Sequence, residues 1–343
     1  MRPFDPYISI VVAARNDNYG GDFTARFQAF VHWNVSLFDR YGLDCELVIV
    51  NWNPIASNAP LEKSVRIPDS KHVRCRVIEV PAELHGLFDD QRSSRVPLYE
   101  FAAKNVGIRR AGGRFVLCTN ADILLHPELV RVLADRRLAA QCYYRADRCD
   151  FEGGVDLTGS IGRNLRVIED NVMTVWTRGA AVRIGGPLNN QVLRRIRQRA
   201  AVTRVIKRVA RSALGIVVPG PRLYNPALEM HLHACGDFTL THRDHWHALR
   251  GYPETTEIAT HTDSLLIAML RHRGMTERCF EWPVFHQEHK RRYDPGGDRA
   301  DAMHRQYRFL VAEAWAMRKR GAAIIYNNQH WGLSDHVLAE TEL

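Results

Sequence analysis

Short apolar runs alternate with stretches of helical periodicity along the first third of the chain. Two runs, Ile8 to Ala14 and Glu46 to Val50, have the length and composition of buried strands, and Arg74 to Val80 is predicted as a third strand, closed by Pro81. Helices are predicted over Thr24 to Arg40 and Leu98 to Arg110, where apolar or small residues recur on one face. The order of strand, helix, strand, strand and helix predicts a Rossmann-like α/β arrangement.

The stretch GIRRAGGRFVLCTNADILLHP, residues 107 to 127, contains the fourth predicted strand. Phe115 to Cys118 is an apolar run after a Gly-Gly break, and Thr119 to Asp122 then interrupts it with small polar residues. Open α/β sheets bind ligands outside the carboxyl ends of their strands. Because hard divalent cations prefer carboxylate oxygens, Asp122 is a candidate metal ligand. A helix cap is the alternative role for this aspartate.

The second half of the chain has a less regular pattern. Helices are predicted over Pro127 to Arg137, Asp263 to Arg273 and Ala302 to Arg318, a strand over Gln141 to Cys149, and a strand or hairpin over Val172 to Ile184. Two segments are predicted to be loops, and the first of them, Pro81 to Pro97, is long enough to be a functional loop or lid. The second loop covers Phe151 to Gly162, where four glycines occur.

Composition limits the class of protein. The chain has 343 residues, of which 45% are apolar and 25% charged, as in ordinary globular proteins of one large or two smaller domains. Its seven cysteines are scattered without CxxC spacing, which favours a reducing compartment over a disulfide or zinc framework. The N-terminus is interpreted as a strand and no apolar segment approaches membrane-spanning length, so we expect a cytoplasmic protein, soluble or peripheral to a membrane.

Most of the net charge of +9 is concentrated in one segment. No acidic residue occurs from Gly185 to Leu228, and eight cations crowd into the eighteen positions 194–211: Arg194, Arg195, Arg197, Arg199, Arg204, Lys207, Arg208 and Arg211. Apolar residues at helical spacing accompany them, namely Val192, Leu193, Ile196, Ala200, Val205, Ile206 and Val209. We interpret residues 191 to 215 as an amphipathic helix at an anionic membrane surface. A solvated helix or disordered insertion is the second interpretation, and nucleic-acid binding the last, since aromatic residues and known motifs are lacking.

Several stretches together resemble GT-A type nucleotide-sugar glycosyltransferases of the family-two-like kind. They are ISIVVAARND, ELVIVNWNP, AKNVGIRRAGGRFVLCTNADILL, ACGDFTLTHRDHWHALRGYPE, ATHTDSLL and HQEH. The resemblance covers nearly the whole chain except about residues 186 to 228, and the order of the elements is more specific than any one motif. It implies a nucleotide-sugar-binding half over residues 1–185, a basic insertion over 186–228 and an acceptor-binding, catalytic half over 229–343.

The activity implied by this resemblance is transfer of a sugar from a UDP or GDP donor, as in polysaccharide biosynthesis. The acceptor would be a glycan or lipid-linked hydroxyl, and the cofactor a divalent cation, Mn²⁺ or Mg²⁺. Two other hypotheses stay open. One is a sugar nucleotidyltransferase, whose phosphate-binding loop after the first strand is normally Gly-rich and basic. The other is a nucleotide-sugar-binding module that has lost catalysis.

The donor-binding residues follow from the resemblance one motif at a time. Asn120-Ala121-Asp122 stands at the D-x-D metal motif, with Asn120 replacing the first acid. Asn51, Trp52 and Asn53 stand at the V-D-D-G-S motif, which implies that Trp52 stacks on the base while an asparagine amide reads its edge. The remaining assignments are Lys104 and Asn105, implied to contact ribose or diphosphate, and Arg15, Asn16 and Asp17, which match the nucleotide-facing loop. A solvated turn is the alternative for that loop.

The last third of the chain supplies the implied catalytic and metal residues. Asp263 in THTDSLL stands where inverting members carry the base that deprotonates the acceptor, and Asp237 in CGDF is the competing candidate. His286 or His289 is implied to complete the metal site with Asp122. Their spacing differs from the H-E-x-x-H motif, so a hydrolytic zinc site is not expected. The alternative roles are a helix cap for Asp263 and an ordinary histidine at either imidazole position.

Overall fold

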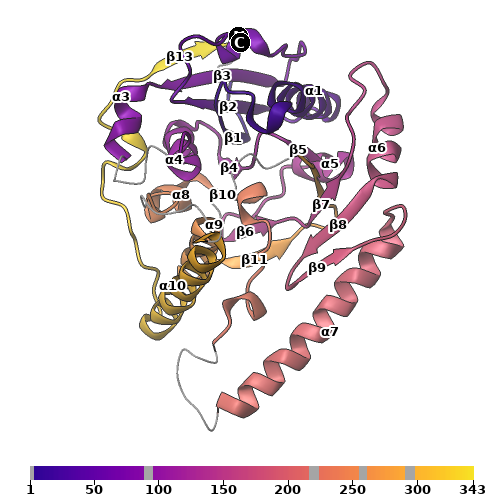
Figure 1. The fold of residues 1–343 in the computed structure, drawn as a ribbon, viewed down its shortest axis with the longest axis vertical. Helices are drawn as coiled ribbons and strands as arrows, with labels where there is room; N and C mark the ends of the chain where they lie inside the picture. Colours follow the sequence, from indigo (N-terminus) through magenta and orange to yellow (C-terminus); the bar gives the residue numbers. More distant parts are fainter. Residues whose placement is uncertain (1–3, 89–95, 216–223, 255–260, 290–297) are drawn as a thin grey trace.

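A computed structural model describes residues 4–88, 96–215, 224–254, 261–289 and 298–343. Its centre is a sheet of eight strands in the order β11-β6-β10-β4-β1-β2-β3-β13 (Figure 1). The parallel part consists of β1 (Ile8–Ala14), β2 (Cys45–Trp52), β3 (Val73–Val80) and β4 (Phe115–Cys118). These are the four strands predicted from the sequence. The almost complete burial of β1, β2 and β4 explains why their sequences lack polar alternation, whereas β3 is half-buried and carries Arg74, Arg76 and Glu79.

The other four strands of this sheet come from later in the chain. They are β6 (Cys142–Arg145), β10 (Thr239–His242), β11 (Thr276–Cys279) and β13 (Ala339–Glu342). β10 lies antiparallel between β4 and β6, and β13 pairs antiparallel with β3 at the far edge. The predicted mixed α/β architecture is confirmed, and the sheet joins strands from both sides of residues 186–228.

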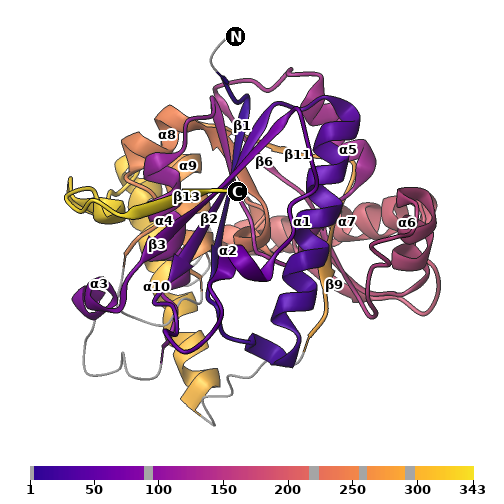
Figure 2. The same cartoon turned by 90° about the horizontal axis from the view of Figure 1, so that it is seen from above.

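Helices cover both faces of the sheet (Figure 2). One face packs against α1 (Phe23–Tyr41) and α5 (Pro127–Ala134), and the other against α4 (Glu100–Arg110), α8 (Arg243–Leu249), α9 (Thr262–His272) and α10 (Asp298–Arg320). The small-residue face predicted for α4 does pack closely on the sheet. A Cβ on Gly107 would lie 2.5 Å from the Val11 Cγ1 atom, so a larger residue would push α4 away from β1.

A second sheet has the order β5-β12-β7-β8-β9. Its strands are β5 (Ile123–Leu125), β12 (Val284–Gln287), β7 (Arg148–Phe151), β8 (Val172–Thr177) and β9 (Ala180–Arg183). The chain passes from the first sheet to the second at three short connections, 119–122, 146–147 and 280–283. The single strand predicted over residues 141–149 is therefore wrong, because Ala146 and Asp147 divide it between two sheets. The hairpin predicted over Val172 to Ile184 is confirmed.

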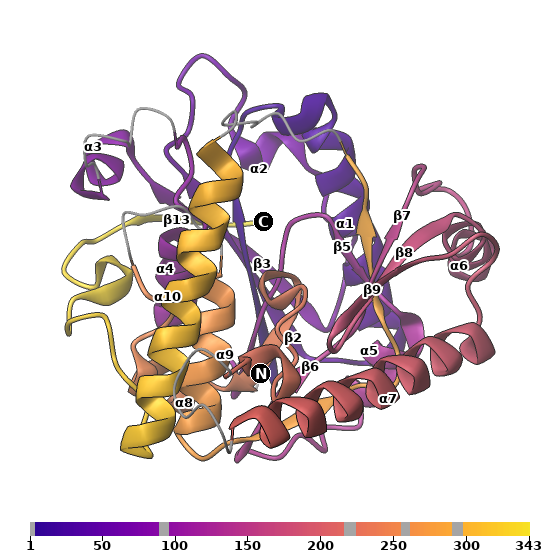
Figure 3. The ribbon, with the colours of Figure 1, turned by 60° about the horizontal axis from the view of Figure 1, so that its bottom comes forward.

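The remaining elements are short helices and turns and the long helix α7. They are α2 (Leu61–Ser64), α3 (Ala82–His85), α6 (Ile161–Asp170), α7 (Asn190–Gly215) and the 3₁₀ turns Tyr19–Gly21, Gly86–Phe88, Pro226–Leu228, Cys235–Asp237 and Trp331–Leu333. The predicted loop 81–97 thus begins with α3, and its residues 89–95 lie outside the described part. Figure 3 shows α7 as a long helix along one edge of the molecule. Among the helices of the described residues, none combines the length and apolar character needed to span a bilayer.

Candidate active site

Three side chains meet where the chain leaves the central sheet for the second sheet. Asp122 lies directly before β5, His286 lies on β12 opposite Ile123, and His289 follows the same strand. Their candidate ligand atoms all lie within 4.8 Å of one another. Nε2 of His289 is 3.4 Å, and Nε2 of His286 3.8 Å, from Oδ2 of Asp122. The structure therefore brings together the three residues that the sequence resemblance named as metal ligands.

The chemistry of this cluster fits a divalent cation. Asp122 is only 9% exposed, and within the described part of the chain its buried Oδ1 atom has no hydrogen-bond partner. Such an orphaned carboxylate oxygen is unfavourable unless a cation or water satisfies it. One carboxylate and two imidazoles form a mixed oxygen and nitrogen donor set that suits Mn²⁺ and similar ions.

Neighbouring charges control the ionisation of the cluster. Burial on its own would raise the pKa of Asp122, but the charges of His286, His289 and Arg26 outweigh burial and lower it. For His286 burial acts to lower the pKa, but the Asp122 and Asp150 carboxylates raise it above its ordinary value. The cluster therefore favours a carboxylate beside an imidazolium, whose proton a bound cation would displace.

Arg26 is a member of this cluster that the sequence analysis missed. Its Nη1 atom lies 2.9 Å from Oδ2 of Asp122. Its Nε and Nη2 atoms donate to Asp22 and to the Tyr19 carbonyl, each at 2.8 Å. The periodicity of α1 identified only its apolar residues, and no local motif points to an arginine buried at the helix start.

Asp150 is a second missed residue, and it orients His286. The parallel pairing of β12 with β7 places His286 opposite Asp150, and Nδ1 of the imidazole lies 3.2 Å from Oδ1 of the carboxylate. Trp176 Nε1 donates to Asp150 at 2.6 Å, which fixes the carboxylate in turn. This contact is an ion pair without hydrogen-bond geometry, and with Nδ1 beside Asp150 the Nε2 atom is on the side of Asp122. The alternation of polar and apolar residues in Arg148-Cys149-Asp150 indicates a separate strand with Asp150 on one face. The single strand predicted over residues 141–149 ended before Asp150 and so missed it.

Asn120 connects this cluster to the remaining predicted residues. Its Oδ1 accepts from Nζ of Lys104 at 2.6 Å, and its Nδ2 donates to Oδ1 of Asp237 at 2.7 Å. The other oxygen of Asp237 accepts from Nη1 of Arg148 at 2.7 Å. Both ends of the Asn120 amide and both oxygens of Asp237 are thus occupied by protein groups. Asn120 acts here as a bridge between an ammonium and a carboxylate.

The implied contact of Lys104 with ribose or diphosphate does not agree with the structure. The Lys104 side chain is fully buried, and besides Asn120 its Nζ donates to Glu100 at 2.7 Å and to the Gly236 carbonyl at 3.0 Å. These three acceptors use every N–H of the ammonium. Lys104 therefore holds α4 to the segment that carries Asp237 and has no donor left for a ligand.

The implied contact of Asn105 with ribose or diphosphate does not agree with the structure either, because the Asn105 side chain has a structural role. Its amide donates to the Tyr252 carbonyl and to Glu254, and its Oδ1 accepts from the Tyr252 N–H at 2.8 Å. Gly251 has a φ of +71°, and a Cβ there would lie 2.2 Å from the Asn105 oxygen. This fully buried amide fixes the turn after α8, and its oxygen and nitrogen are both hydrogen-bonded to protein groups.

Asp263 lies in the first turn of α9 and is partly exposed. Its Oδ2 accepts from the Gly236 N–H and its Oδ1 from the Ser264 N–H, both at 2.7 Å. Gly236 precedes Asp237, which the Arg148 ion pair links to Asp150 and thereby to His286. Polar contacts and the peptide bond between Gly236 and Asp237 therefore connect the two predicted catalytic aspartates with the Asp122, His286 and His289 cluster.

The loops after β1 and β2 are joined by the predicted polar residues. Arg15 Nε donates to the Asn53 carbonyl at 2.7 Å, and the guanidinium also pairs with Asp17 at 2.9 Å. The Asn16 side chain forms two hydrogen bonds with the backbone of Ile55. These contacts hold the loop from Arg15 to Asp17 in place and fix the loop following β2. The alternative of a free solvated turn is therefore wrong.

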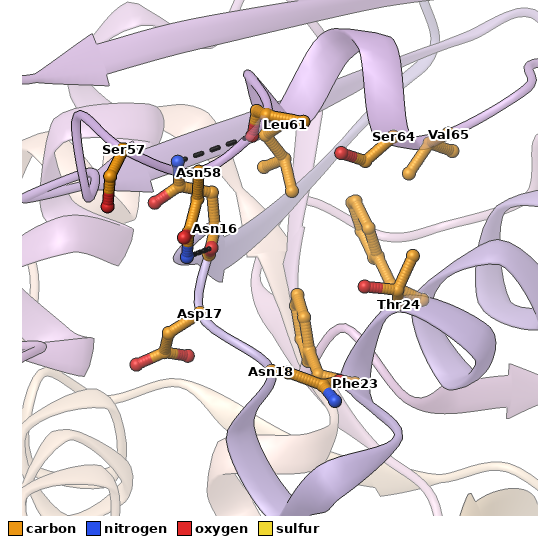
Figure 4. Close-up of a pocket in the computed structure, with 12 residues that line it drawn as sticks. Asn16, Asp17, Asn18, Phe23, Thr24, Ser57, Asn58, Leu61, Ser64 and Val65 are labelled. Carbon is orange, nitrogen blue, oxygen red and sulfur yellow. Dashed lines mark hydrogen bonds between the residues drawn. The ribbon is translucent and has the colours of Figure 1, made fainter.

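A pocket of about 370 Å³ lies between these two loops and the start of α1 (Figure 4). Its lining residues are Asn16, Asp17, Asn18, Phe23, Thr24, Phe27, Ser57, Asn58, Ala59, Leu61, Ser64 and Val65. Tyr19 follows the lining residue Asn18, and its ring packs edge-on against His289 with centroids 5.4 Å apart. The segment that lines one part of the pocket therefore also contacts the Asp122, His286 and His289 cluster through Tyr19.

The predicted stacking of Trp52 on a base is wrong. Trp52 is fully buried, its Nε1 donates to Nδ1 of His85 at 2.9 Å, and its ring packs edge-on against Phe88. Asn51 is equally buried, and neither atom of its amide has a hydrogen-bond partner within the described residues. Asn53 is partly exposed and left-handed, with a φ of 49°. Of these three residues, Asn53 alone lies at the surface.

Comparisons with known proteins place the chain beside two solved structures. No protein-family model and no curated protein matches the chain. GalNAc-T7 with UDP, GalNAc and Mn²⁺ matches 94% of this chain and 53% of its own, with a TM-score of 0.47 and 12% identity. Mannosyltransferase PcManGT from Pyrobaculum calidifontis, in complex with GDP-Man and Mn²⁺, matches 92% of this chain and 65% of its own, with a TM-score of 0.36 and 14% identity. The chain thus spans less than two thirds of the length of either structure.

Proposed function

We propose that this protein is a glycosyltransferase that moves a sugar from a nucleoside-diphosphate donor to a glycan or lipid-linked hydroxyl. The observation that supports the proposal best is the Asp122, His286 and His289 cluster, with its orphaned carboxylate oxygen, at the carboxyl end of β4. A divalent cation bound there would supply positive charge to the leaving diphosphate. We propose a cytoplasmic site of action, peripheral to a membrane.

The pocket beside the cluster fits the nucleoside part of such a donor. Asp17 and Asn58 offer a carboxylate and an amide, and Phe23 an aromatic surface, in a space of about 370 Å³. Tyr19 follows the lining residue Asn18 and contacts His289, so in this proposal a nucleoside held in the pocket directs its phosphates toward the cluster. In this proposal Arg15 and Asn16 act by holding the two loops together, and Asn53 takes part through its backbone.

Asp263 is the proposed general base for the acceptor hydroxyl. Its carboxylate accepts backbone N–H groups, has no ion pair among the described residues, and is partly exposed. Asp237, in contrast, is 3% exposed and is neutralised by Arg148. A base must reach the proton that it removes, which favours Asp263 over Asp237. Attack by a hydroxyl that Asp263 deprotonates would invert the anomeric carbon.

Two other functions make different predictions. A sugar nucleotidyltransferase would need a phosphate-binding loop after β1, whereas Arg15 and Asn16 use their side chains to fix a neighbouring loop. A degenerate binding module is favoured by one observation, the replacement of the first motif acid by Asn120, whose amide is fully used.

Donor turnover by the purified full chain distinguishes these functions. UDP- and GDP-sugars are incubated with and without Mn²⁺, and free nucleoside diphosphate is measured. We expect slow, metal-dependent release of UDP or GDP, accelerated by an acceptor. Pyrophosphate exchange instead of release would show a nucleotidyltransferase. Donor binding without turnover under all conditions would contradict catalysis and identify a binding module.

A further inference from the structure

The basic helix α7 has two different faces. Leu193, Ile196 and Ala200 are buried against the body of the protein. On the same side Arg197 pairs with the buried carboxylate of Asp147 and donates to the Glu281 carbonyl at 2.6 Å. This face holds α7 to the rest of the molecule.

The opposite face carries an apolar stripe in solvent. Val202, Val205, Ile206 and Val209 are 59%, 60%, 62% and 63% exposed. Their spacing of three, one and three residues places them on one side of a helix. The sequence analysis treated the apolar residues of α7 as a single face, which is wrong. They divide between an inward set that packs on the protein and this outward stripe.

Cations surround the stripe. Arg195 and Arg199 are exposed and precede Val202 by seven and three residues, so they continue the outward face toward the N-terminus of α7. Arg208 is exposed three residues after Val205 and borders the stripe on its other side. Lys207 is also exposed, but it follows Ala200 by seven residues and so lies on the side of the inward face. No acidic residue occurs between Gly185 and Leu228, so nothing within this segment neutralises them.

We infer that the outward face of α7 docks on an anionic lipid surface. Aliphatic side chains between cations match the two layers of such a surface, since the apolar groups enter the acyl boundary while the cations stay at the phosphates. Long Lys and Arg side chains can extend their charges from an apolar stripe to the headgroups. The inference does not depend on the proposed sugar transfer, although a lipid-linked acceptor would lie at the same surface.

A second copy of the chain fits this face less well. Two stripes that pack together would bring the cations at their borders together, and like charges without acidic partners repel. Four aliphatic side chains on one helix also provide much less than the roughly 800 Å² per partner of a typical specific interface. Anionic lipid satisfies the apolar and the charged groups at once.

Vesicle binding by the full chain tests the inference. The probes are phosphatidylcholine vesicles with about 30% phosphatidylglycerol and vesicles of phosphatidylcholine alone, in low and high salt. We expect salt-sensitive binding to the anionic vesicles only. Val205→Asn with Ile206→Asn, and separately Arg199→Gln with Arg208→Gln, should each weaken binding at least tenfold. These side chains are exposed, so unfolding curves should stay unchanged.

The exposed face of α6 provides a matched control. Arg163→Gln with Arg166→Gln, and Val167→Asn, make the same chemical changes on another surface helix and should alter binding less than about twofold. Absence of binding by the unaltered protein, or equal losses in the α6 variants, would overturn the inference. A dimer in sedimentation velocity that the Val205→Asn and Ile206→Asn variant dissociates would assign the face to a second copy instead.

Discussion

Arg26 and Asp122 form a buried ion pair of 2.9 Å between residues that are 96 positions apart in the chain. The guanidinium occupies one oxygen of the carboxylate, while the other oxygen has no hydrogen-bond partner among the described residues. His286 and His289 approach the same carboxylate from β12 and the segment after it. Asp122 thus pairs with the protein's own cation, Arg26, and also belongs with His286 and His289 to a cluster suited to a metal ion.

Replacing Arg26 should therefore strengthen metal binding. In Arg26→Gln the carboxylate loses a competing positive charge, and we expect Mn²⁺ affinity to rise about three- to tenfold. Without metal the variant should be less stable by about 2–4 kcal/mol, because a buried carboxylate loses its partner. Titration calorimetry and urea unfolding with and without Mn²⁺ measure the two effects. Unchanged or weaker Mn²⁺ binding would show that Arg26 does not compete for Asp122.

Removing Asp122 itself should abolish specific metal binding. Asp122→Ala eliminates the carboxylate of the cluster, so the increase in melting temperature caused by Mn²⁺ should disappear. The matched control is Asp244→Ala, which removes a carboxylate of α8 that is 78% exposed. It should keep the full effect of Mn²⁺. A normal thermal shift in Asp122→Ala would place the metal elsewhere.

The sequence predicted the scaffold of this site better than its contacts. Buried parallel strands appear as continuous apolar runs, so β1, β2, β4 and the position of Asp122 followed from local composition. Strand pairing is different, because it depends on contacts far apart in the chain. The juxtaposition of His286 and Asp150 arises from the pairing of β12 with β7, which no local pattern encodes.

Trp52 illustrates a second limit of local patterns. A tryptophan at the end of a strand is equally suited to stacking on a base and to packing in the core, and the residue type alone does not distinguish the two roles. Its environment is decided by α3 and Tyr99, which come later in the chain and cover its ring. Lys104 is similar, because only the approach of Glu100, Asn120 and the Gly236 carbonyl makes burial of its ammonium favourable.

The proposed base makes a kinetic prediction. Asp263→Asn preserves an acceptor for the Gly236 N–H but cannot take a proton, so we expect transfer to fall about 10²–10⁴-fold. Donor affinity and the unfolding curve should change little, which distinguishes loss of the base from misfolding. Near wild-type transfer by this variant would exclude Asp263, and Asp237 would be the next residue to replace.

Lys104 tests whether a buried cation acts through structure or through ligand contact. Lys104→Met leaves Asn120 and the Gly236 carbonyl without their donor, and we expect a loss of about 2–4 kcal/mol in the free energy of unfolding. Lys71→Met replaces an exposed lysine and should cost less than about 0.5 kcal/mol. A direct donor contact would give the opposite result, with weakened nucleoside-diphosphate binding in a Lys104→Met protein of normal stability.

His126 should make stability depend on acid pH. Its Nδ1 caps α5 by accepting from the Glu128 N–H at 3.1 Å, and its ring stacks on Trp282. Burial lowers the pKa of His126 from 6.5 to about 4. Between these values the unfolded chain binds a proton that the folded chain does not, so stability falls as the pH decreases through this window. The loss from this histidine should approach about 2–3 kcal/mol near pH 4.

The variant His126→Asn isolates this contribution. Asparagine also caps helices but does not titrate, so the variant should lose stability at neutral pH through the missing ring contact yet lose less on acidification. Urea unfolding at about pH 7 and about pH 4.5 gives the difference for each protein. His233, whose pKa burial also lowers to about 4, is present in both proteins and cancels in the comparison. Equal acid losses in the two proteins would mean that His126 takes up its proton in the folded state as readily as in the unfolded chain.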